Sequence, residues 1–338
     1  MSKHKASADR KLSKKTIVGI TAVSLAVILI ILSLIVLTRW EKEQGNSPTQ
    51  IPLSSPADNS VRYNGKSYTP KNNLETLLVM GLDKYEGQIE SDSYINDLQA
   101  DFLMLFVIDH ANSKVCSIHV NRDTMVDIQR PTLNGDTISV NAQIALTYAY
   151  GDGGKGSCID TSKAVSSVLQ GVDIEHYIAI TMDAVPVYND LVDGVEVTVL
   201  DDFTGIDDTL IEGETVTLYG EHALNYVRTR YGLEDSTNST RMERQRQYLT
   251  ALLDKTNLCI EEDDSFIFDA VQTISPYMIS DCTSQRLETL FESLTSYEFT
   301  DIYQLEGENV AGDSHMEFYV DDISVKDVVM QVFYTPES

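Results

Sequence analysis

Arginines gather in one short stretch of the chain. Nine arginines follow Glu41, and five of them lie within 19 residues with no lysine among them: Arg228, Arg230, Arg241, Arg244 and Arg246. The guanidinium group is planar and forms paired hydrogen bonds with phosphate oxygens, so this concentration indicates phosphate recognition. A solvated face paired with nearby acids such as Glu221 and Glu234 explains the same residues as well.

A helix start signal accompanies these arginines. Thr240 and Glu243 have the spacing of a capping box, which predicts that a helix begins after Thr240. The N-terminus of that helix would attract an anion, and Arg241 and Gln245, four residues apart, would share one face there. Arg244 and Arg246 would point away from Arg241, so we expect both to tolerate lysine.

Two aspartates and another arginine are expected at the open end of a hairpin. Strands are predicted over residues 102–109 and 115–120. Asp101 and Arg122 are equally far from the centre of the turn between them, so antiparallel pairing would set them face to face. A strand at 77–80 leads to Asp83, which could reach the same edge. The group could form a metal and phosphate site. A surface ion pair, with Asp83 as a turn residue, is the simpler alternative.

The surrounding pattern alternates short apolar runs with helical ones, which predicts a sheet covered by helices. Further strands are predicted over residues 177–182, 195–200, 317–320 and 328–333. Helices are predicted over residues 141–150, 160–170, 185–191, 221–230, 240–253, 266–273 and 284–294. We therefore expect an α/β (α+β) fold with a central mixed, largely antiparallel sheet and helices on both faces.

An uncharged stretch at residues 16–38 precedes this body. As a helix its 23 residues would extend ~34 Å, enough for a hydrocarbon core of ~30 Å. Six bases lie in residues 1–15 and one follows the stretch, which predicts one transmembrane anchor with a cytoplasmic basic tail and an extracellular body. A cleaved signal peptide is the alternative, but its apolar region would be shorter. Residues 41–73, rich in Ser, Pro, Asn and Gln, indicate an extracellular spacer.

Charge and cysteine content restrict the function further. The net charge is −27, and without the seven bases and one acid that precede Trp40 the remainder has 18 basic and 51 acidic residues, a net of −33. Such a body repels nucleic acid, which we exclude as a partner. The four cysteines match no zinc spacing. Cys259 and Cys282 bracket a predicted short helix and are the expected disulfide pair, with buried free thiols as the alternative.

Several short motifs follow one another in a specific order. They are residues 77–83 (LLVMGLD), 100–102 (ADF), 121–124 (NRDT), 141–142 (NA), 148–151 (YAYG), 194–199 (GVEVTV), 220–230 (GEHALNYVRTR) and 241–247 (RMERQRQ). Together they resemble the LytR-CpsA-Psr family of membrane-anchored cell-wall enzymes. The resemblance covers about residues 74–255 as the catalytic domain, and residues 256–338 are expected to be a C-terminal extension packed on the same body.

The resemblance implies a membrane-anchored phosphotransferase that moves a glycopolymer from a polyprenyl-diphosphate carrier to peptidoglycan. It implies Mg²⁺ near Asp83 and Asp101, and a carrier lipid in an apolar tunnel between sheet and helices. The residues that correspond to the diphosphate clamp of the family are Arg122, Arg228, Arg230 and Arg241, with Gln245 beside them. An acceptor hydroxyl would attack the phosphorus nearer the glycan. Arg122 would act with a general base, for which Asp123 and Asp235 are the two candidates.

The chain departs from the family pattern in two places. Gln99-Ala-Asp-Phe102 stands where the family usually has Arg-Ser-Asp-Thr, and Thr237-Asn-Ser-Thr240 stands where it has Gly-Asp-Phe-Gly. A catalytically weak module that binds a polyprenyl lipid or the cell wall is therefore the alternative to an enzyme. A lipid diphosphatase is a further variant.

Overall fold

The computed structural model describes residues 60–84, 96, 98–229, 238–263, 265–312 and 315–337. The chain divides into Met1–Asp58 and Asn59–Ser338, and the described residues belong to the second unit. The predicted basic tail, the predicted anchor at 16–38 and the spacer up to residue 59 lie outside the described residues. Within the described ranges, every helix is too short or too polar to cross a bilayer.

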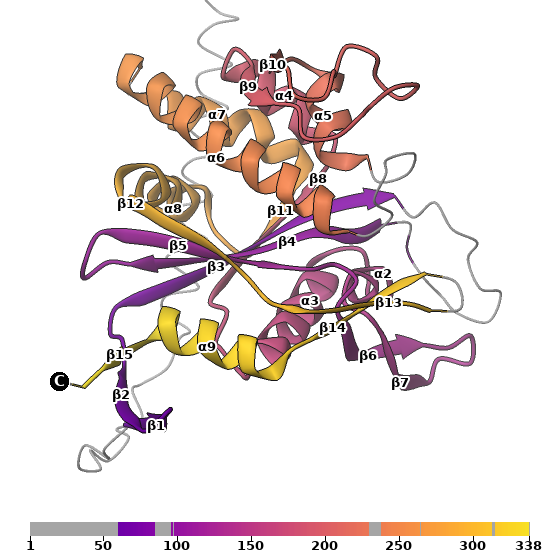
Figure 1. Ribbon diagram of the computed structural model, residues 1–338, viewed down its shortest axis with the longest axis vertical. Helices are drawn as coiled ribbons and strands as arrows, with labels where there is room; N and C mark the ends of the chain where they lie inside the picture. Colours follow the sequence, from indigo (N-terminus) through magenta and orange to yellow (C-terminus); the bar gives the residue numbers. More distant parts are fainter. Residues whose placement is uncertain are drawn as a thin grey trace, which may run out of the picture. The chain divides into compact units, whose positions relative to one another are not determined.

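A six-stranded sheet forms the centre of the described unit (Figure 1). Its order is β11 (Met278–Ser280), β8 (His176–Thr181), β3 (Leu74–Lys84), β4 (Leu98–Asp109), β5 (Lys114–Val120) and β12 (Glu298–Gln304). The neighbours β8–β3 and β5–β12 are parallel and the other three pairs are antiparallel. The prediction of a mixed central sheet is confirmed.

The two faces of the sheet bury alternate residues of the same strands, because successive side chains of a strand point to opposite sides. Leu78, Leu105 and Ile118 pack with α3 (Lys155–Val168) and α9 (Asp322–Phe333). We call this side the α3 face. Leu77 and Phe106 pack on the other side, the α6 face, with helices of the second half of the chain (Figure 1). Those helices are α6 (Ser239–Glu262), α7 (Phe266–Ile274) and α8 (Ser284–Ser296). Helices on both faces were predicted, and the structure confirms them.

A lobe with its own apolar core adjoins α6. It comprises α4 (Ala184–Leu191), β9 (Val195–Thr198), β10 (Thr215–Leu218) and α5 (Glu221–Arg228). Its core contains Phe203 and Tyr226, whose rings stack with centroids 5.8 Å apart, and it includes Tyr248 of α6. Through Tyr248, this lobe core packs against α6.

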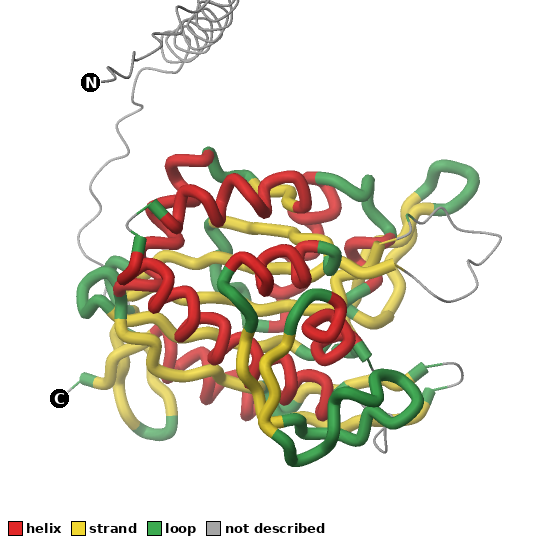
Figure 2. Tube along the Cα trace, turned by 90° about the horizontal axis from the view of Figure 1, so that it is seen from above, coloured by secondary structure: helices red, strands yellow, loops and turns green. Residues whose placement is uncertain are grey.

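Smaller elements complete the described unit, which Figure 2 shows in a view turned by 90° and coloured by secondary structure. Two hairpins are formed by β6 (Met125–Pro131) with β7 (Thr137–Gln143), and by β13 (Gly307–Ala311) with β14 (Met316–Val320). The short helices α2 (Leu146–Ala149) and η1 (Ser275–Tyr277) link larger elements. A three-stranded sheet pairs β1 (Val61–Tyr63), β2 (Lys66–Pro70) and β15 (Tyr334–Pro336). Ordered strands therefore occupy residues 61–70, where an irregular spacer was predicted.

Three predicted elements differ from the structure for local reasons. Residues 328–333 are helical in α9, because the carboxylate of Asp321 caps the helix by accepting from the Ile323 amide at 3.0 Å, and an apolar stripe that includes Val325 and Val332 is buried. Residues 141–150 are not one helix, because β7 continues to Gln143 as the partner of β6. Helix α3 begins at Lys155, earlier than the predicted start at residue 160, because the Asp152 carboxylate accepts hydrogen bonds from backbone amides of its first turn.

The four cysteines are free thiols, so the predicted bridge between Cys259 and Cys282 is wrong. Cys259 lies on α6 and packs against the lobe core. Cys282 follows β11 and packs against the α6-face core. The two side chains thus belong to different apolar clusters, although a short helix lies between them in the sequence.

Candidate active site

A β-bulge marks the edge of the sheet where the site lies. Gly81 pairs with Phe102 but Leu82 pairs with Ala100, so Asp101 is the extra residue of β4. Ala100 packs into the α3-face core, whereas Phe102 packs on the α6 face. Bulges re-aim side chains at such edges. Here the bulge allows the residues before and after Asp101 to pack into the cores of opposite faces. It also allows the Asp101 carboxylate to contact an arginine of α6.

Asp101 lies between two buried arginines. Its Oδ1 is 3.3 Å from Arg122 Nε, and its Oδ2 is 3.4 Å from Arg241 Nη1. The register that pairs Leu103 with Val120 extends by two residues to set Asp101 opposite Arg122, as the hairpin predicted. The side chains of Arg122 and Arg241 are only 7% and 4% exposed. The alternative of a surface ion pair is therefore wrong, and these charges are held where water screens them little.

Residues behind Arg122 fix its position. Gln99 Oε1 accepts from Arg122 Nη2 at 2.5 Å, and Asp123 Oδ1 lies 3.6 Å from Arg122 Nε. Asp123 is 1% exposed and accepts from Gln143 Nε2 at 2.6 Å, while the same amide donates to the Met316 carbonyl at 2.8 Å. Asp123 is thus held beneath the guanidinium by β7 and β14.

Sequence reasoning missed two of these supporting residues. The sequence marks Gln99 only as a departure from a family arginine position, and Gln143 lies in a stretch predicted as helix. The pairing of β6 with β7 brings Gln143 to Asp123. An alternating pattern across residues 137–143 is the signal that could have placed it.

The first turn of α6 carries Arg241 to the bulge. The predicted capping box is wrong, because α6 begins at Ser239 and Asn238 is its N-terminal flanking residue. Asn238 Nδ2 donates to Asn121 Oδ1 at 2.9 Å, which ties the start of α6 to the turn after β5. Gln245 lies one turn further along α6 and donates from Nε2 to the Val227 carbonyl at 3.1 Å.

The second predicted metal residue contacts another arginine. Asp83 Oδ2 lies 2.5 Å from Arg228 Nε, at the end of α5. The exposed fractions of the two side chains are 15% and 39%. Asp83 pairs with Gln99 in the ladder, so both aspartates lie at one edge of the β3–β4 pair. The other predicted residues, Arg230 and Asp235, lie outside the described residues.

Arg244 and Arg246 serve other parts of the molecule. The side chain of Arg244 is 0% exposed, pairs with Asp201 Oδ2 at 2.7 Å and lies 5.2 Å from the centre of the Phe203 ring. It also donates to the carbonyls of Tyr226 and Thr229. Arg244 therefore organises the lobe core, which corrects the expectation that it tolerates lysine. Because Arg241 and Arg244 are buried, the alternative of a solvated face is wrong for them.

The side chain of Arg246 contacts a different part of the molecule. It is half-buried, and its Nε and Nη2 lie 3.1 and 3.2 Å from the amide oxygen of Gln304 when that amide is oriented toward it. Near these cations, His119 is 1% exposed and its ring lies 5.1 Å from that of Phe102. Burial, followed by the positive charges of Arg246 and Arg241, lowers the pKa of His119 to about 3. His119 is thus neutral at physiological pH.

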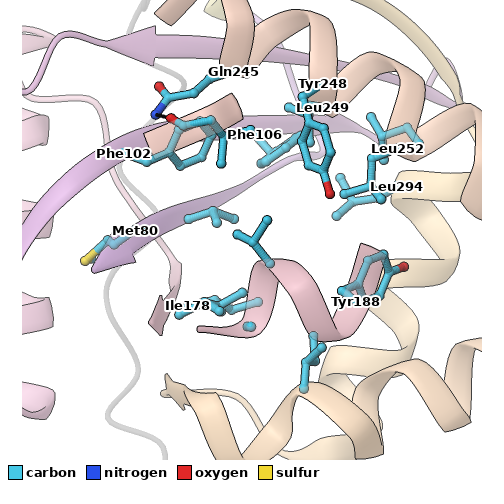
Figure 3. Close-up of a pocket in the computed structure, with 18 of the residues that line it drawn as sticks. Met80, Phe102, Phe106, Ile178, Tyr188, Gln245, Tyr248, Leu249, Leu252 and Leu294 are labelled. Atoms are coloured by element: carbon cyan, nitrogen blue, oxygen red, sulfur yellow. Dashed lines mark hydrogen bonds between the residues drawn. The ribbon is translucent and has the colours of Figure 1, made fainter. Parts of the chain in front are cut away.

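An apolar cavity of ≈ 250 Å³ lies between the α6 face of the sheet and α4, α6 and α8 (Figure 3). Labelled members of its lining are Met80, Phe102, Phe106, Ile178, Tyr188, Gln245, Tyr248, Leu249, Leu252 and Leu294. The Tyr188 hydroxyl forms a hydrogen bond with Thr256 Oγ1 at 3.2 Å, and the Tyr248 hydroxyl donates to Asn189 Oδ1 at 3.0 Å. Phe102 follows Asp101 directly and Gln245 lies one turn from Arg241, so the cavity ends beside the charged cluster.

The donor chemistry at this end fits a hard cation. Asp83 and Asp101 offer anionic oxygens from adjacent strands, which is the ligand type that Mg²⁺ prefers. Asp101 Oδ1 is buried and makes no hydrogen bond to the residues that the structure describes, although it is close to Arg122. An oxygen of this kind can take a metal ion as its partner.

The fold and the cluster agree with one protein family. The model of the LytR_cpsA_psr family matches residues 43–332, so the chain belongs to this family. The match confirms the resemblance and extends it over nearly all of the predicted spacer and most of the predicted C-terminal extension.

Solved structures show the same fold at low sequence identity. TagT bound to LI-WTA has a TM-score of 0.59 and 20% identity, covering 79% of this chain and 92% of that one. B. subtilis TagV has a TM-score of 0.58 and 22% identity, covering 78% and 96%. Protein gbs0355 from Streptococcus agalactiae has a TM-score of 0.61 and 19% identity, covering 77% and 86%. No curated protein matches the chain.

Proposed function

We propose that the protein is a membrane-anchored phosphotransferase that moves a glycopolymer from a polyprenyl-diphosphate carrier to peptidoglycan in cell-wall assembly. One observation carries this proposal: an apolar cavity ends beside a buried cluster of arginines and aspartates. A ligand that fits both parts has a long apolar chain and an anionic head. TagT, which has the same fold, has been solved bound to LI-WTA and to LIIa-WTA.

The charged cluster would bind the diphosphate. Arg122 and Arg241 present guanidinium groups in a buried setting, where charge-assisted hydrogen bonds to phosphate are strong. Arg228 and Arg230 would complete the clamp at the end of α5, with Gln245 at the boundary between head and chain. These donors would stabilise the charge that develops on the departing polyprenyl phosphate. Asp83 and Asp101 would hold Mg²⁺, which when bound neutralises phosphate charge.

Two aspartates were candidates for the general base, and the surroundings of Asp123 favour a positioning role for it. Asp123 is 1% exposed, accepts from Gln143 and faces Arg122, so we assign it the task of positioning that arginine. A base must reach the hydroxyl whose proton it accepts. Asp235 is then the candidate base, and it would act when the acceptor sugar attacks the phosphorus nearer the glycan.

The location of the reaction follows from the predicted anchor. A helix at residues 16–38 with bases before it would leave the body outside the cell membrane, where peptidoglycan is built. The second candidate function is a binding module with weak catalysis. It is favoured by Gln99, a neutral residue at a family arginine position, which accepts from Arg122 instead of adding a positive charge.

The full chain, extracted in detergent, tests the proposal with a lipid-linked glycan, peptidoglycan fragments and Mg²⁺. Released polyprenyl phosphate is the readout. We expect Asp101→Asn to abolish transfer, since an amide cannot replace an anionic metal ligand, and to keep lipid bound, since the apolar chain supplies most of the affinity. Asp160→Asn, on α3 and away from the cluster, is the matched control.

Each outcome of this assay decides between the candidates. Transfer by the wild type and by Asp160→Asn, with none by Asp101→Asn, supports the phosphotransferase. Lipid binding without release indicates a binding module, and release that does not depend on peptidoglycan indicates a diphosphatase. Full transfer by Asp101→Asn contradicts the assigned role of the cluster.

A further inference from the structure

A second group of titratable side chains lies at the opposite end of the central sheet from Asp83. β3 and β8 run parallel, with Leu77 beside His176, so both strands begin at this end. β11 pairs with β8, and the last pair of this ladder is Ser280 with Ile178. Two more residues in the same register place Cys282 opposite His176. Directly opposed residues have Cβ atoms only about 5 Å apart.

Three different donor atoms meet there. One ligand atom each from His176, Asp281 and Cys282 lies within 4.8 Å of the others. His176 Nδ1 is 3.3 Å from Asp281 Oδ2, and Cys282 Sγ is 3.5 Å from Asp281 Oδ1. A set of nitrogen, oxygen and sulfur suits Zn²⁺, whereas Mg²⁺ and Ca²⁺ prefer oxygen alone. The donor chemistry at this end of the sheet therefore differs from that at the end that carries Asp83 and Asp101.

Neighbouring groups hold the donors in orientations that suit a shared ion. The Tyr177 amide donates to Asp281 Oδ1 at 3.1 Å, which leaves Oδ2 turned to His176. The Cys282 amide donates to Ser280 Oγ at 3.0 Å, which fixes the turn after β11. Both contacts are made by backbone amides of the strand ends, so the sheet itself positions two of the three ligands.

The other ring nitrogen of His176 faces a buried carboxylate. Nε2 lies 3.4 Å from Glu75 Oε1, and the Glu75 side chain is 6% exposed. Glu75 also pairs with Arg286 and, at 2.8 Å, with His110 Nε2. Metal-binding histidines commonly direct their second ring nitrogen to a carboxylate, which fixes the ring and raises its basicity. A simple ion pair of His176 with Asp281 would not require this second carboxylate.

We propose that His176 Nδ1, Asp281 Oδ2 and Cys282 Sγ bind a Zn²⁺ ion, with Glu75 as the carboxylate that orients His176. On binding, the thiol of Cys282 loses its proton to solvent and the thiolate becomes a ligand. Water fills the fourth position. The ion fastens the segment between β11 and α8 to the start of β8, about a hundred residues earlier in the chain. This inference is independent of the proposed transferase activity.

Binding of Co²⁺ by the full chain in detergent tests the site, because cobalt replaces zinc and reports a thiolate ligand through a near-ultraviolet charge-transfer band. We expect one equivalent of Co²⁺ to give this band and Zn²⁺ to displace it. Cys282→Ser should abolish the band and His176→Gln should weaken Co²⁺ binding strongly. Cys259→Ser, which removes another half-buried thiol, and Asp101→Asn, at the other end of the sheet, should leave the band unchanged.

Two further measurements separate a metal site from a fold defect. With EDTA, Cys282→Ser should have the Tm of the wild type, and only the wild type should gain Tm when Zn²⁺ replaces EDTA. Glu75→Gln should keep the band and weaken Co²⁺ binding by roughly 10–100-fold. The proposal is overturned if the wild type shows no band, if Cys282→Ser keeps it, or if Zn²⁺ raises the Tm of both proteins equally.

Discussion

The two faces of the central sheet are built from the same strands and do different work. On the α3 face, Leu78, Leu105 and Ile118 are 0% exposed and belong to one continuous core. On the α6 face, the helices leave an apolar cavity of ≈ 250 Å³ that ends beside Asp101 and Arg241. The filled face therefore stabilises the sheet, while the other face keeps a space and a charged cluster that the proposed lipid diphosphate would need.

The largest expected effect is a difference in the free energy of unfolding between a variant on the α3 face and a variant on the α6 face. Leu105→Ala on the α3 face removes a fully buried side chain from close packing, so we expect the free energy of unfolding to fall by about 2–5 kcal/mol. Leu249→Ala on α6 removes atoms that already border empty space, so its loss should be about 1 kcal/mol or less. Urea denaturation of the two variants measures both. Equal losses would mean that the α6 face is packed as tightly as the α3 face.

A smaller effect distinguishes two arginines of α6. Arg244→Lys cannot serve Asp201 and the carbonyls of Tyr226 and Thr229 together, and it leaves buried acceptors unsatisfied. We expect a loss of about 1–3 kcal/mol in the free energy of unfolding. Arg246→Lys, half-buried and near Gln304, is the matched control and should lose about 0.5 kcal/mol or less. Thermal unfolding ranks the pair, and an equal loss would contradict the structural role of Arg244.

The last effect is a pH dependence that arises beneath the cluster. Burial lowers the pKa of His119 from 6.5 to about 3. Below pH 6.5, His119 therefore binds a proton in the unfolded chain but stays neutral in the folded chain. The contribution of neutral His119 to the free energy of unfolding is fully present above pH 6.5. It is lost as the pH falls toward 3, by up to about 1.4 kcal/mol per pH unit. His119→Phe keeps a ring beside Phe102 but does not titrate. Unfolding at pH 7 and at pH 4.5 should show a smaller difference for this variant than for the wild type, and equal differences would contradict a buried neutral His119.

Much of the α3 face and of the hairpin could be predicted from the sequence, because both depend on local pattern. The turn at residues 110–114 fixed the register that sets Asp101 opposite Arg122, and the salt bridge between them is found. The strands at 77–80 and 177–182 were also located by their apolar alternation. The β-branched run at 328–333 misled the prediction, since the cap at Asp321 and burial along a helical stripe decide in favour of α9.

The rest of the site depends on contacts between distant segments, which no local pattern records. Gln143 supports Asp123 only because β7 pairs with β6 and packs beside β14. Arg244 looks like a neighbour of Arg241 in sequence, but α6 turns it into the lobe core. The bulge at Asp101 is likewise invisible until the pairing of β3 with β4 is known.

The central claim is that the apolar cavity holds the chain of a polyprenyl lipid whose head binds the charged cluster. Mass spectrometry of lipid that is retained by the full chain after extraction from membranes tests it most directly. Leu252→Trp fills the cavity from α6, and Leu258→Trp, 54% exposed on the same helix, is the matched control. With Tm values showing that both variants are folded, we predict polyprenyl lipid on the wild type and Leu258→Trp and little on Leu252→Trp. Equal lipid on all three proteins, or none on the wild type, would contradict the claim.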